Sequence, residues 1–408
     1  MMDNVSSSGF ALAADGLMPC EEMLEVINKS KKMQIALPRE SFADENRVAL
    51  APHAVGFLVN QGHDVIIEKG AGERARFDDA KYVAEGARIS TNRAELYSSE
   101  VIVKVLPPTF EELDMMPGKQ VLFSSYDIHS QDCRYIQKLL EKKITAVSFE
   151  YYKDKRADEY PIAQSISEIS GSTAVMIAAE YLSNEHGGKG EMLGGVSGIS
   201  PTEVVILGAG TAGESAARTA MGLGATVKVF DLSITKLRAM QEHLGQRFFT
   251  SVLQQRVLLK ALRTADVVIG ALYENNDRHR DFIVMEDAVT QMKPRSVIVD
   301  LCMNQGGCFE TSQRTSFANP VYYTAGVAHY CVPNIPSRVA RTASYAVSNV
   351  LVQLLIELGE AGGINQLVRQ HYGVRCGTYV FNGILVKECV ASHFGIPFQD
   401  INLIMAAF

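Results

Sequence analysis

Residues 204–213 read Val-Val-Ile-Leu-Gly-Ala-Gly-Thr-Ala-Gly, a short apolar run followed by the pattern G-x-G-x-x-G. A helix-forming stretch, residues 214–223, comes next, and a second apolar run, 227–230, ends at Asp231. Strand, glycine turn, helix, strand and acid therefore arrive in the order that a dinucleotide-binding βαβ unit requires. The alternative reading is a glycine-rich turn in an ordinary α/β sheet.

Each residue of this run has a physical role in such a unit. Gly208 permits the tight turn out of the strand, Gly210 lets a pyrophosphate approach the backbone, and Gly213 lets the helix pack close to the sheet. The helix N-terminus offers free N–H groups to the phosphates. Asp231 lies where a carboxylate would bond the ribose hydroxyls of NAD and repel a 2′-phosphate. The sequence thus predicts an NAD site.

Length and composition exclude several classes of protein. The chain has 408 residues, 47% of them hydrophobic and 21% charged, so we expect two folded domains rather than a disordered chain. The net charge of −7 argues against a nucleic-acid partner, which calls for a clustered basic face. No apolar run is long enough to span a bilayer, and residues 1–32 lack the features of a secretory signal. A cytoplasmic protein is the expectation.

The cysteines point the same way. Seven are present, an odd number, and they form no C-x-x-C pair and no cluster with histidine. This usage favours reduced structural thiols in a cytoplasm, and it predicts no metal site.

The rest of the chain alternates short apolar strands with helical segments, which predicts parallel sheets covered by helices on both faces. An amphipathic helix is expected over 165–185 and an apolar helix over 345–358, with a glycine-rich loop over 187–198. The expected strands are 34–37, 64–67, 101–105, 121–124 and 145–149, then 204–207, 226–230, 266–271, 296–301 and 321–323.

The position of the apolar helix suggests that the chain returns to its first domain after completing the second. We therefore expect an α/β protein of two Rossmann-like, doubly wound parallel-sheet domains with a cleft between them. Residues 1–32 form an N-terminal extension, 33–164 and 340–408 a discontinuous substrate domain, and 165–339 an inserted NAD-binding domain. The cleft is the expected site of chemistry.

Several further runs make the sequence similar to a known family, the alanine dehydrogenase and pyridine nucleotide transhydrogenase family. The resemblance covers residues 33 to about 400, and the last two runs resemble alanine dehydrogenases in particular. The runs are Pro38-Arg39-Glu40, residues 45–52 (Glu-Asn-Arg-Val-Ala-Leu-Ala-Pro), 68–72 (Glu-Lys-Gly-Ala-Gly), 167–171 (Ser-Glu-Ile-Ser-Gly), 292–294 (Met-Lys-Pro), 305–310 (Gln-Gly-Gly-Cys-Phe-Glu) and 329–336 (His-Tyr-Cys-Val-Pro-Asn-Ile-Pro).

This resemblance implies an NAD-dependent oxidative deamination of L-alanine to pyruvate and ammonia, carried out by a hexamer. Arg47 matches the family arginine that binds the substrate carboxylate, a task suited to a planar guanidinium fork. Ser167, Asp231, Lys236, Val332 and Asn334 fall where the family contacts NAD. Asn334 could equally be a turn residue, since it lies between two prolines.

The catalytic positions depart from the family pattern. The family has Lys-Val-Lys-Glu-Pro, and here Leu106 replaces the second lysine, which faces the substrate. The family histidine after a Leu-Phe pair falls on Asp127 by direct counting, with His129 two residues further on. The family's catalytic aspartate is replaced by Asn304, which can form hydrogen bonds but cannot take up a proton at neutral pH.

Three nearby groups could compensate: Lys104, Asp127 and His129. In a strand, Lys104 points to the same face as Leu106, because side chains alternate, so it could reach the same cleft. Alternatively, Lys104 is a strand-end lysine in solvent, and His129 is a helix-start histidine. We expect Lys104 and His129 to take part in acid–base chemistry and Asn304 to lie beside the nicotinamide.

Several functions remain open at this point. The first is an alanine dehydrogenase-like enzyme, with an altered substrate or rate. A relative for another amino acid, such as a saccharopine-type dehydrogenase, belongs to the same class, because Leu106 makes the pocket less polar. The second is a non-catalytic NAD-binding protein, and the third is a soluble subunit of a proton-pumping transhydrogenase.

Overall fold

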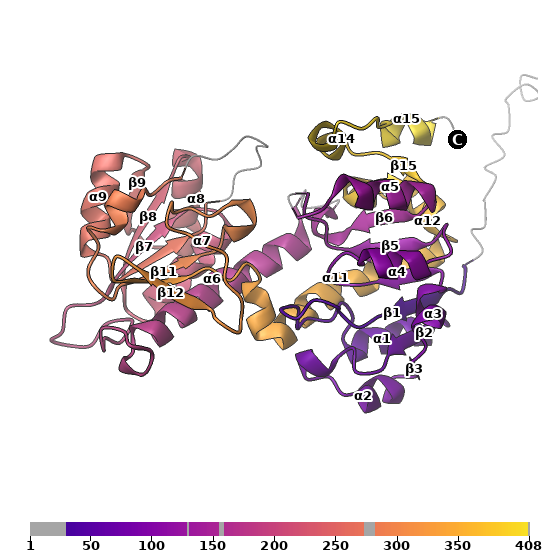
Figure 1. Ribbon diagram of the computed structural model, residues 1–408, viewed down its shortest axis with the longest axis horizontal. Coiled ribbons are helices and arrows are strands. Elements are labelled where there is room, and N and C mark those ends of the chain that lie inside the picture. Colours follow the sequence, from indigo (N-terminus) through magenta and orange to yellow (C-terminus); the bar gives the residue numbers. More distant parts are fainter. Residues whose placement is uncertain (1–29, 129, 155–158, 273–281, 407–408) are drawn as a thin grey trace, which may run out of the picture.

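The computed structural model describes residues 30–128, 130–154, 159–272 and 282–406, and they form two lobes, each built around one sheet (Figure 1). The central strands of both sheets are almost entirely apolar and buried. Such continuous apolar runs are typical of parallel strands covered on both faces by helices.

The first sheet has eight strands in the order β15-β14-β6-β5-β4-β1-β2-β3. Strands β1 to β6 are parallel, while β14 pairs antiparallel with both β6 and β15. The chain thus begins in the middle of the sheet, builds one side and then the other, which is the doubly wound arrangement. The strands are β1 (Gln34–Leu37), β2 (Asp64–Glu68), β3 (Arg88–Ser90), β4 (Val101–Val103), β5 (Val121–Ser124), β6 (Thr145–Ser148), β14 (Thr378–Phe381) and β15 (Ile384–Leu385).

Short helices cover this first sheet, and a C-terminal group of them lies on the same lobe as the first strands, as the yellow and indigo colours of Figure 1 show. These helices are α1 (Pro52–Asn60), α2 (Asp79–Ala84), α3 (Arg93–Tyr97), α4 (Phe110–Met115), α5 (Cys133–Glu141), α12 (Ile364–Gln370), α13 (Tyr372–Gly377), α14 (Glu388–Phe394) and α15 (Ile401–Ala406), with the 3₁₀ turns η2 (Glu73–Ala75) and η3 (Phe149–Tyr151).

The second sheet has seven strands in the order β12-β13-β11-β10-β7-β8-β9, parallel except for the β12–β13 pair. Its strands are β7 (Glu203–Leu207), β8 (Thr226–Asp231), β9 (Phe249–Val252), β10 (Val267–Gly270), β11 (Val297–Asp300), β12 (Val321–Thr324) and β13 (Val327–Tyr330). Its helices are α7 (Thr211–Gly222), α8 (Ile234–Leu244), α9 (Gln255–Thr264) and α10 (Glu286–Val289), with the 3₁₀ turns η4 (Asn184–His186) and η5 (Met303–Gln305).

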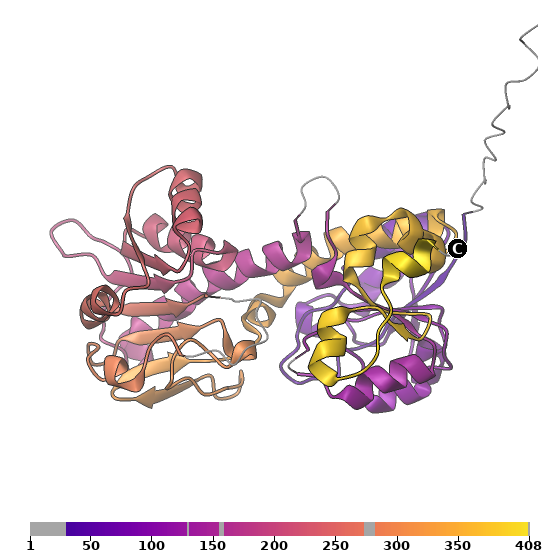
Figure 2. The same ribbon diagram turned by 90° about the horizontal axis from the view of Figure 1, so that it is seen from above.

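Two long helices join the lobes. Helix α6 (Pro161–Leu182) leads out of the first lobe, and α11 (Ala340–Glu360), preceded by the 3₁₀ helix η6 (Ile335–Val339), leads back into it. The two helices contact each other and run side by side between the lobes (Figure 2). By length and composition alone the segment Ile335–Glu360 could cross a membrane, but half of it is buried inside the protein. Its apolar character is explained by packing, because its buried side chains belong to the hydrophobic core of the first lobe.

The ten strands expected from the sequence are all present, most within one residue of their expected bounds. One boundary was wrong in a way that matters for the site: β4 ends at Val103, so Lys104 and Leu106 lie beyond the strand and the alternation argument does not apply to them. The sheets are also mixed rather than purely parallel, because antiparallel strands close one edge of each. The domain boundaries at 164/165 and 339/340 stay a prediction, and most of the extension 1–32 lies outside the described residues.

Candidate active site

The glycine turn after β7 is built for close approach of the backbone. Gly208 has φ +115°, and a Cβ there would lie 2.4 Å from the carbonyl oxygen of Ala271. A Cβ on Gly213 would lie 1.9 Å from the carbonyl oxygen of Gly208, so only glycine lets α7 start this close to the strand. At Gly210, by contrast, a Cβ would meet no described atom within 4 Å. Gly210 thus leaves open space in front of the first turn of α7, where a pyrophosphate fits.

Asp231, the last residue of β8, closes this turn from the neighbouring strand. Its carboxylate accepts hydrogen bonds from the backbone N–H of Ala209 and from that of Ser233, both at 2.7 Å. Each oxygen keeps a lone pair for a further donor, so ribose hydroxyls could be accommodated here. The residues present therefore fit a dinucleotide, and the position of the acid disfavours a 2′-phosphate.

A cavity of about 530 Å³ lies beside Gly210. It is bordered by α6, α7 and α8, and Lys236 on α8 is part of its lining. Ser167 lies on α6 between the lining residues Gln164 and Glu168 and is half-buried. The structure thus places Lys236 at the mouth of the glycine turn, and Ser167 on the helix that borders it.

On the first lobe, Arg47 is buried and paired with Glu45. Its Nε and Nη2 donate to the two carboxylate oxygens of Glu45 at 2.8 and 2.7 Å. Burial alone would raise the pKa of Glu45, but the charge and hydrogen bonds of Arg47 hold it below its ordinary value. A buried guanidinium needs such a partner, and the pairing fixes its plane.

The same carboxylate reaches the segment between β13 and α11. Asn334 Nδ2 donates to Glu45 Oε2 at 2.9 Å, and Ser337 Oγ donates to Oε1 at 3.2 Å. Asn334 is thus a hydrogen-bond partner of the arginine's counter-ion rather than only a turn residue. Val332, two residues earlier, is buried in the core of the second lobe.

Lys104 lies just beyond β4 and is fully buried. Its ammonium stands 3.1 Å from both carboxylate oxygens of Glu112, and 3.9 Å from Glu40. Burial would raise the pKa of Glu112, but Lys104 and Ser41 lower it below its ordinary value. Lys104 is therefore neither in solvent nor at an open surface, but half of a buried ion pair.

Glu40 contacts the segment where the chain departs from the family pattern, residues 105–106. Its carboxylate accepts the backbone N–H of Val105 at 2.6 Å and that of Leu106 at 3.4 Å. Burial raises the pKa of Glu40 to about 7, against the opposing charge of Lys104. The Leu106 side chain is half-buried and offers no polar group at this point.

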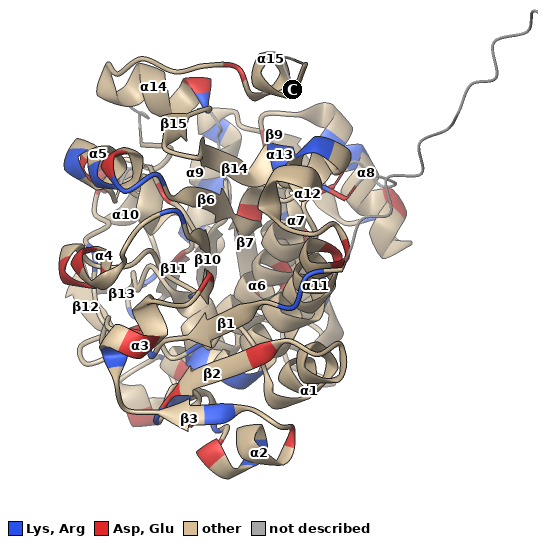
Figure 3. Ribbon diagram, turned by 90° about the vertical axis from the view of Figure 1, so that its right-hand side faces the viewer, with Lys and Arg blue, Asp and Glu red and all other residues tan. Residues whose placement is uncertain are grey.

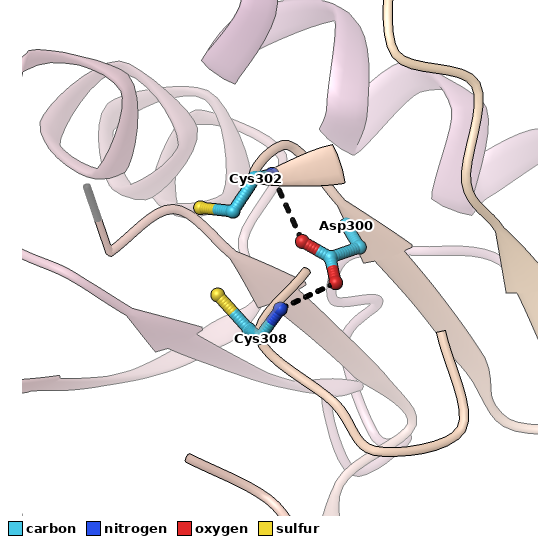
Figure 4. Close-up of side chains that lie close together, drawn as sticks. All are labelled: Asp300, Cys302 and Cys308. Atoms are coloured by element: carbon cyan, nitrogen blue, oxygen red, sulfur yellow. Dashed lines mark hydrogen bonds between the residues drawn. The ribbon is translucent and has the colours of Figure 1, made fainter. Parts of the chain in front are cut away.

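Asn304 lies on η5 in the loop after β11 and is exposed. Asp300 fixes the conformation of this loop. Its two carboxylate oxygens accept hydrogen bonds from the backbone N–H of Cys302 at 2.9 Å and of Cys308 at 2.7 Å (Figure 4). The ligand atoms of these three residues lie within 4.8 Å of one another, close enough for a metal ion. Since Ser312 Oγ also donates to Asp300 at 2.7 Å, the carboxylate serves as a brace for the loop.

The remaining candidates lie at the ends of β5 and β6. Asp127 follows β5 and is half-buried, whereas His129 lies outside the described residues. Glu150 follows β6 on η3. Glu150 was not singled out from the sequence, and the roles of Glu40, Glu45, Glu112 and Asp300 were not predicted from it. Glu40 and Glu45 nevertheless fall inside the runs that carry the resemblance.

Two domain models of one family match most of this chain, one after the other. The alanine dehydrogenase/PNT N-terminal domain matches residues 36–170, and the C-terminal domain of the same family matches residues 174–388. The chain belongs to the alanine dehydrogenase/PNT family. The second domain match extends beyond the second sheet into the C-terminal strands of the first, because α11 carries the chain back.

Relatives from this family are similar over nearly their whole length. The alanine dehydrogenase of Halomonas elongata is 36% identical over 90% of this chain and 98% of its own. That of Mycobacterium tuberculosis is 33% identical over 92% and 100%. A solved L-alanine dehydrogenase superposes with a TM-score of 0.83 at 34% identity, covering 89% of this chain and 99% of its own. A transhydrogenase from Sinorhizobium meliloti follows, with a TM-score of 0.74 at 25% identity over 87% and 99%.

Proposed function

We propose that this protein catalyses the NAD-dependent oxidative deamination of L-alanine to pyruvate and ammonia, and the reverse amination. One observation carries the proposal: a glycine turn closed by Asp231 and a buried, oriented Arg47 occur together in a chain similar to alanine dehydrogenases over nine-tenths of its length. The family match also supports a two-domain oxidoreductase that uses a nicotinamide cofactor.

The binding steps follow from the residues described above. The glycine turn and the first turn of α7 bind the pyrophosphate, and Asp231 accepts hydrogen bonds from the ribose hydroxyls. Lys236 and Ser167 lie on the helices that border the cavity beside Gly210. Arg47 holds the substrate carboxylate through the part of its guanidinium that Glu45 leaves unused, its Nη1. When bound, the nicotinamide supplies the acceptor for the hydride that leaves the substrate Cα. Asn304, Val332 and Asn334 are proposed to lie near the nicotinamide end.

Acid–base assistance is the demanding part, because the reaction moves protons at almost every step. Lys104 and His129 remain the residues proposed from the sequence for this role. In the structure the Lys104 ammonium is already bound to Glu112, so using it would require that ion pair to open.

The experiment is the absorbance of NADH in the presence of purified protein, pyruvate and ammonium. We expect NADH to be consumed, with NADPH a poor substitute. Absence of consumption across a panel of 2-oxo acids, with NADH binding demonstrated by fluorescence, would refute the proposal.

A second candidate is a non-catalytic NAD-binding relative, which Leu106 and Asn304 favour because they remove a lysine and a carboxylate. The double change Leu106→Lys with Asn304→Asp separates the two. Activity that appears only in the double variant identifies a latent scaffold, whereas robust wild-type turnover eliminates this candidate. A dehydrogenase for another amino acid, including a saccharopine-type reaction, is tested by the same panel.

The proposed setting is a cytoplasmic homo-oligomer, a hexamer by resemblance, without nucleic-acid or membrane partners. Figure 3 shows acidic and basic segments interspersed over the end of the first lobe, with no broad basic face on the side in view. Light scattering of the purified protein would measure the oligomeric state.

A further inference from the structure

Four parallel strands of the first sheet deliver ionisable side chains to one edge. Glu40 follows β1, Lys104 follows β4, Asp127 follows β5 and Glu150 follows β6. The carboxyl ends of parallel strands meet at the same edge of a sheet, which is where doubly wound proteins bind their ligands. Arg47, the residue proposed to hold the substrate carboxylate, is within electrostatic range of both Glu40 and Glu150.

Lys104 and Glu40 are already engaged by the protein. The Lys104 side chain is only 1% exposed, and its ammonium donates to both carboxylate oxygens of Glu112. The Glu40 carboxylate holds the backbone of residues 105 and 106 in place through their N–H groups. Each would have to give up a structural contact in order to exchange a proton with a ligand.

Glu150 is in a different situation. Its side chain is half-buried, and among the described residues no hydrogen bond to the backbone or to another side chain ties down its carboxyl. The charged groups around it are Arg47, Asp127 and Glu45. It therefore lies within electrostatic range of the proposed substrate arginine, with its oxygens available to a ligand.

We infer that Glu150 is the group that exchanges protons with the bound amino acid in this chain, in place of the lysine and aspartate that are absent at positions 106 and 304. The inference rests on the proposed function. Burial raises the pKa of Glu150 to about 7, with Arg47 opposing and the negative charges of Asp127 and Glu45 adding to the rise. A general base is most effective when its pKa lies near the working pH.

The proton balance can be written with this one carboxyl. The Glu150 carboxylate takes a proton from the substrate ammonium and releases it to solvent, and the electron pair of the Cα–H bond leaves as hydride to the cofactor. Water then adds to the iminium carbon while Glu150 takes its proton. Glu150 then returns that proton to the nitrogen of the carbinolamine. The C–N bond breaks and the carbonyl forms, and the hydroxyl proton leaves on the ammonia as ammonium.

The test compares Glu150→Gln with Glu40→Gln, which makes the same change at another buried carboxyl of the same edge. Deamination of L-alanine and amination of pyruvate are followed by NADH absorbance from pH 5.5 to 10, and NADH binding is followed by fluorescence.

In the wild type, kcat/KM for deamination should rise with pH through about 7, the pKa of Glu150. Glu150→Gln should lower kcat by about 10²- to 10⁴-fold, abolish that rise and leave NADH affinity unchanged. Glu40→Gln should retain the rise.

Three outcomes overturn the inference. Retention of the pH dependence in Glu150→Gln, or its loss in Glu40→Gln as well, removes Glu150 from the role while the proposed function stands. A wild type that binds NADH but aminates no 2-oxo acid rejects the proposed function, and the inference with it. Glu150→Asp, which keeps a carboxyl one methylene shorter, should recover part of the lost kcat if the role is chemical rather than structural.

Discussion

Asn334 and Glu45, 289 residues apart in the chain, are joined by a hydrogen bond of 2.9 Å. Asn334 belongs to the segment that leaves the second sheet, and Glu45 holds the guanidinium of Arg47 in the first lobe. The orientation of the proposed substrate-binding arginine is thus coupled to the backbone that follows β13. The same asparagine was expected from the family resemblance to contact NAD.

Replacing Asn334 by alanine separates these two roles. Loss of the hydrogen bond to Glu45 destabilises the oriented Glu45–Arg47 ion pair by about 1 kcal/mol. If the same free energy is lost from substrate binding, KM for pyruvate should rise by about fivefold. The NADH dissociation constant, measured by fluorescence, should change little. A weaker NADH complex with an unchanged KM would instead assign Asn334 to the cofactor.

Replacing Arg47 by lysine should weaken substrate binding without disturbing the cofactor. Lysine keeps the charge but loses the two-point pairing with Glu45 that orients the guanidinium and the Nη1 that it directs to the substrate, so KM for pyruvate should rise by about 10- to 100-fold. Steady-state kinetics with NADH saturating provide the measurement. An unchanged KM would show that the substrate carboxylate binds elsewhere.

The two glycines of the turn provide a matched pair of alanine substitutions. Gly213→Ala places a Cβ 1.9 Å from the carbonyl oxygen of Gly208 and should lower the free energy of unfolding by about 1–3 kcal/mol. Gly210→Ala meets open space, so the fold should be kept while NADH binding weakens by about tenfold or more, because the Cβ occupies the phosphate face. Urea unfolding and NADH fluorescence titration of both variants check this. Equal effects of the two substitutions on NADH affinity and on stability would contradict it.

The pair Lys104–Glu112 tests whether the lysine is structural or catalytic. Lys104→Met removes the buried ammonium from the Glu112 carboxylate, which keeps Arg93 as its remaining cation at 2.6 Å, and should cost about 1.5–3 kcal/mol of stability. Lys104→Met with Glu112→Leu removes both buried charges and should recover part of that loss. If the double variant also keeps its kcat, Lys104 serves the fold alone. A stable but inactive double variant would support the acid–base role proposed from the sequence.

Glu40 should make stability depend on pH. Its pKa is raised from 4.5 to about 7 on folding, so between these values the folded chain binds more protons than the unfolded chain and stability falls as the pH rises. Glu40→Gln removes this dependence, so its stability relative to wild type should increase by up to about 3 kcal/mol between pH 4.5 and 8. Urea unfolding at both pH values measures the difference. A stability difference that is constant with pH would show that Glu40 is not protonated in the folded protein.

The geometry of the proposed dinucleotide site could be predicted because the residues that form it are close together in the sequence. Gly208, Gly210, Gly213 and Asp231 act through backbone geometry within one βαβ unit, and their spacing in the sequence fixes their spacing in space. The apolar strands were equally readable, since burial on both faces demands continuous apolar runs.

The environments of the candidate acid–base residues were harder to predict, because they depend on contacts between segments that are distant in the sequence. Nothing near Lys104 in the sequence reveals that the Glu112 side chain folds back onto it, and β4 ends at Val103, two residues before the predicted end of that strand. Glu150 carried no motif of its own. Its environment is made by Arg47, Asp127 and Glu45, which arrive from other elements.

The paired helices α6 and α11 limit how this protein can move. The chain crosses between its lobes only through these two helices among the described residues, and they lie against each other. We therefore expect any relative motion of the two lobes to be a rotation about these two helices. Translation of one lobe along the other would disrupt the packing between α6 and α11. We expect substrate entry and product release to use rotation about this helix pair, and such a rotation would strain the hydrogen bond between Asn334 and Glu45, which joins the two lobes just before α11 begins.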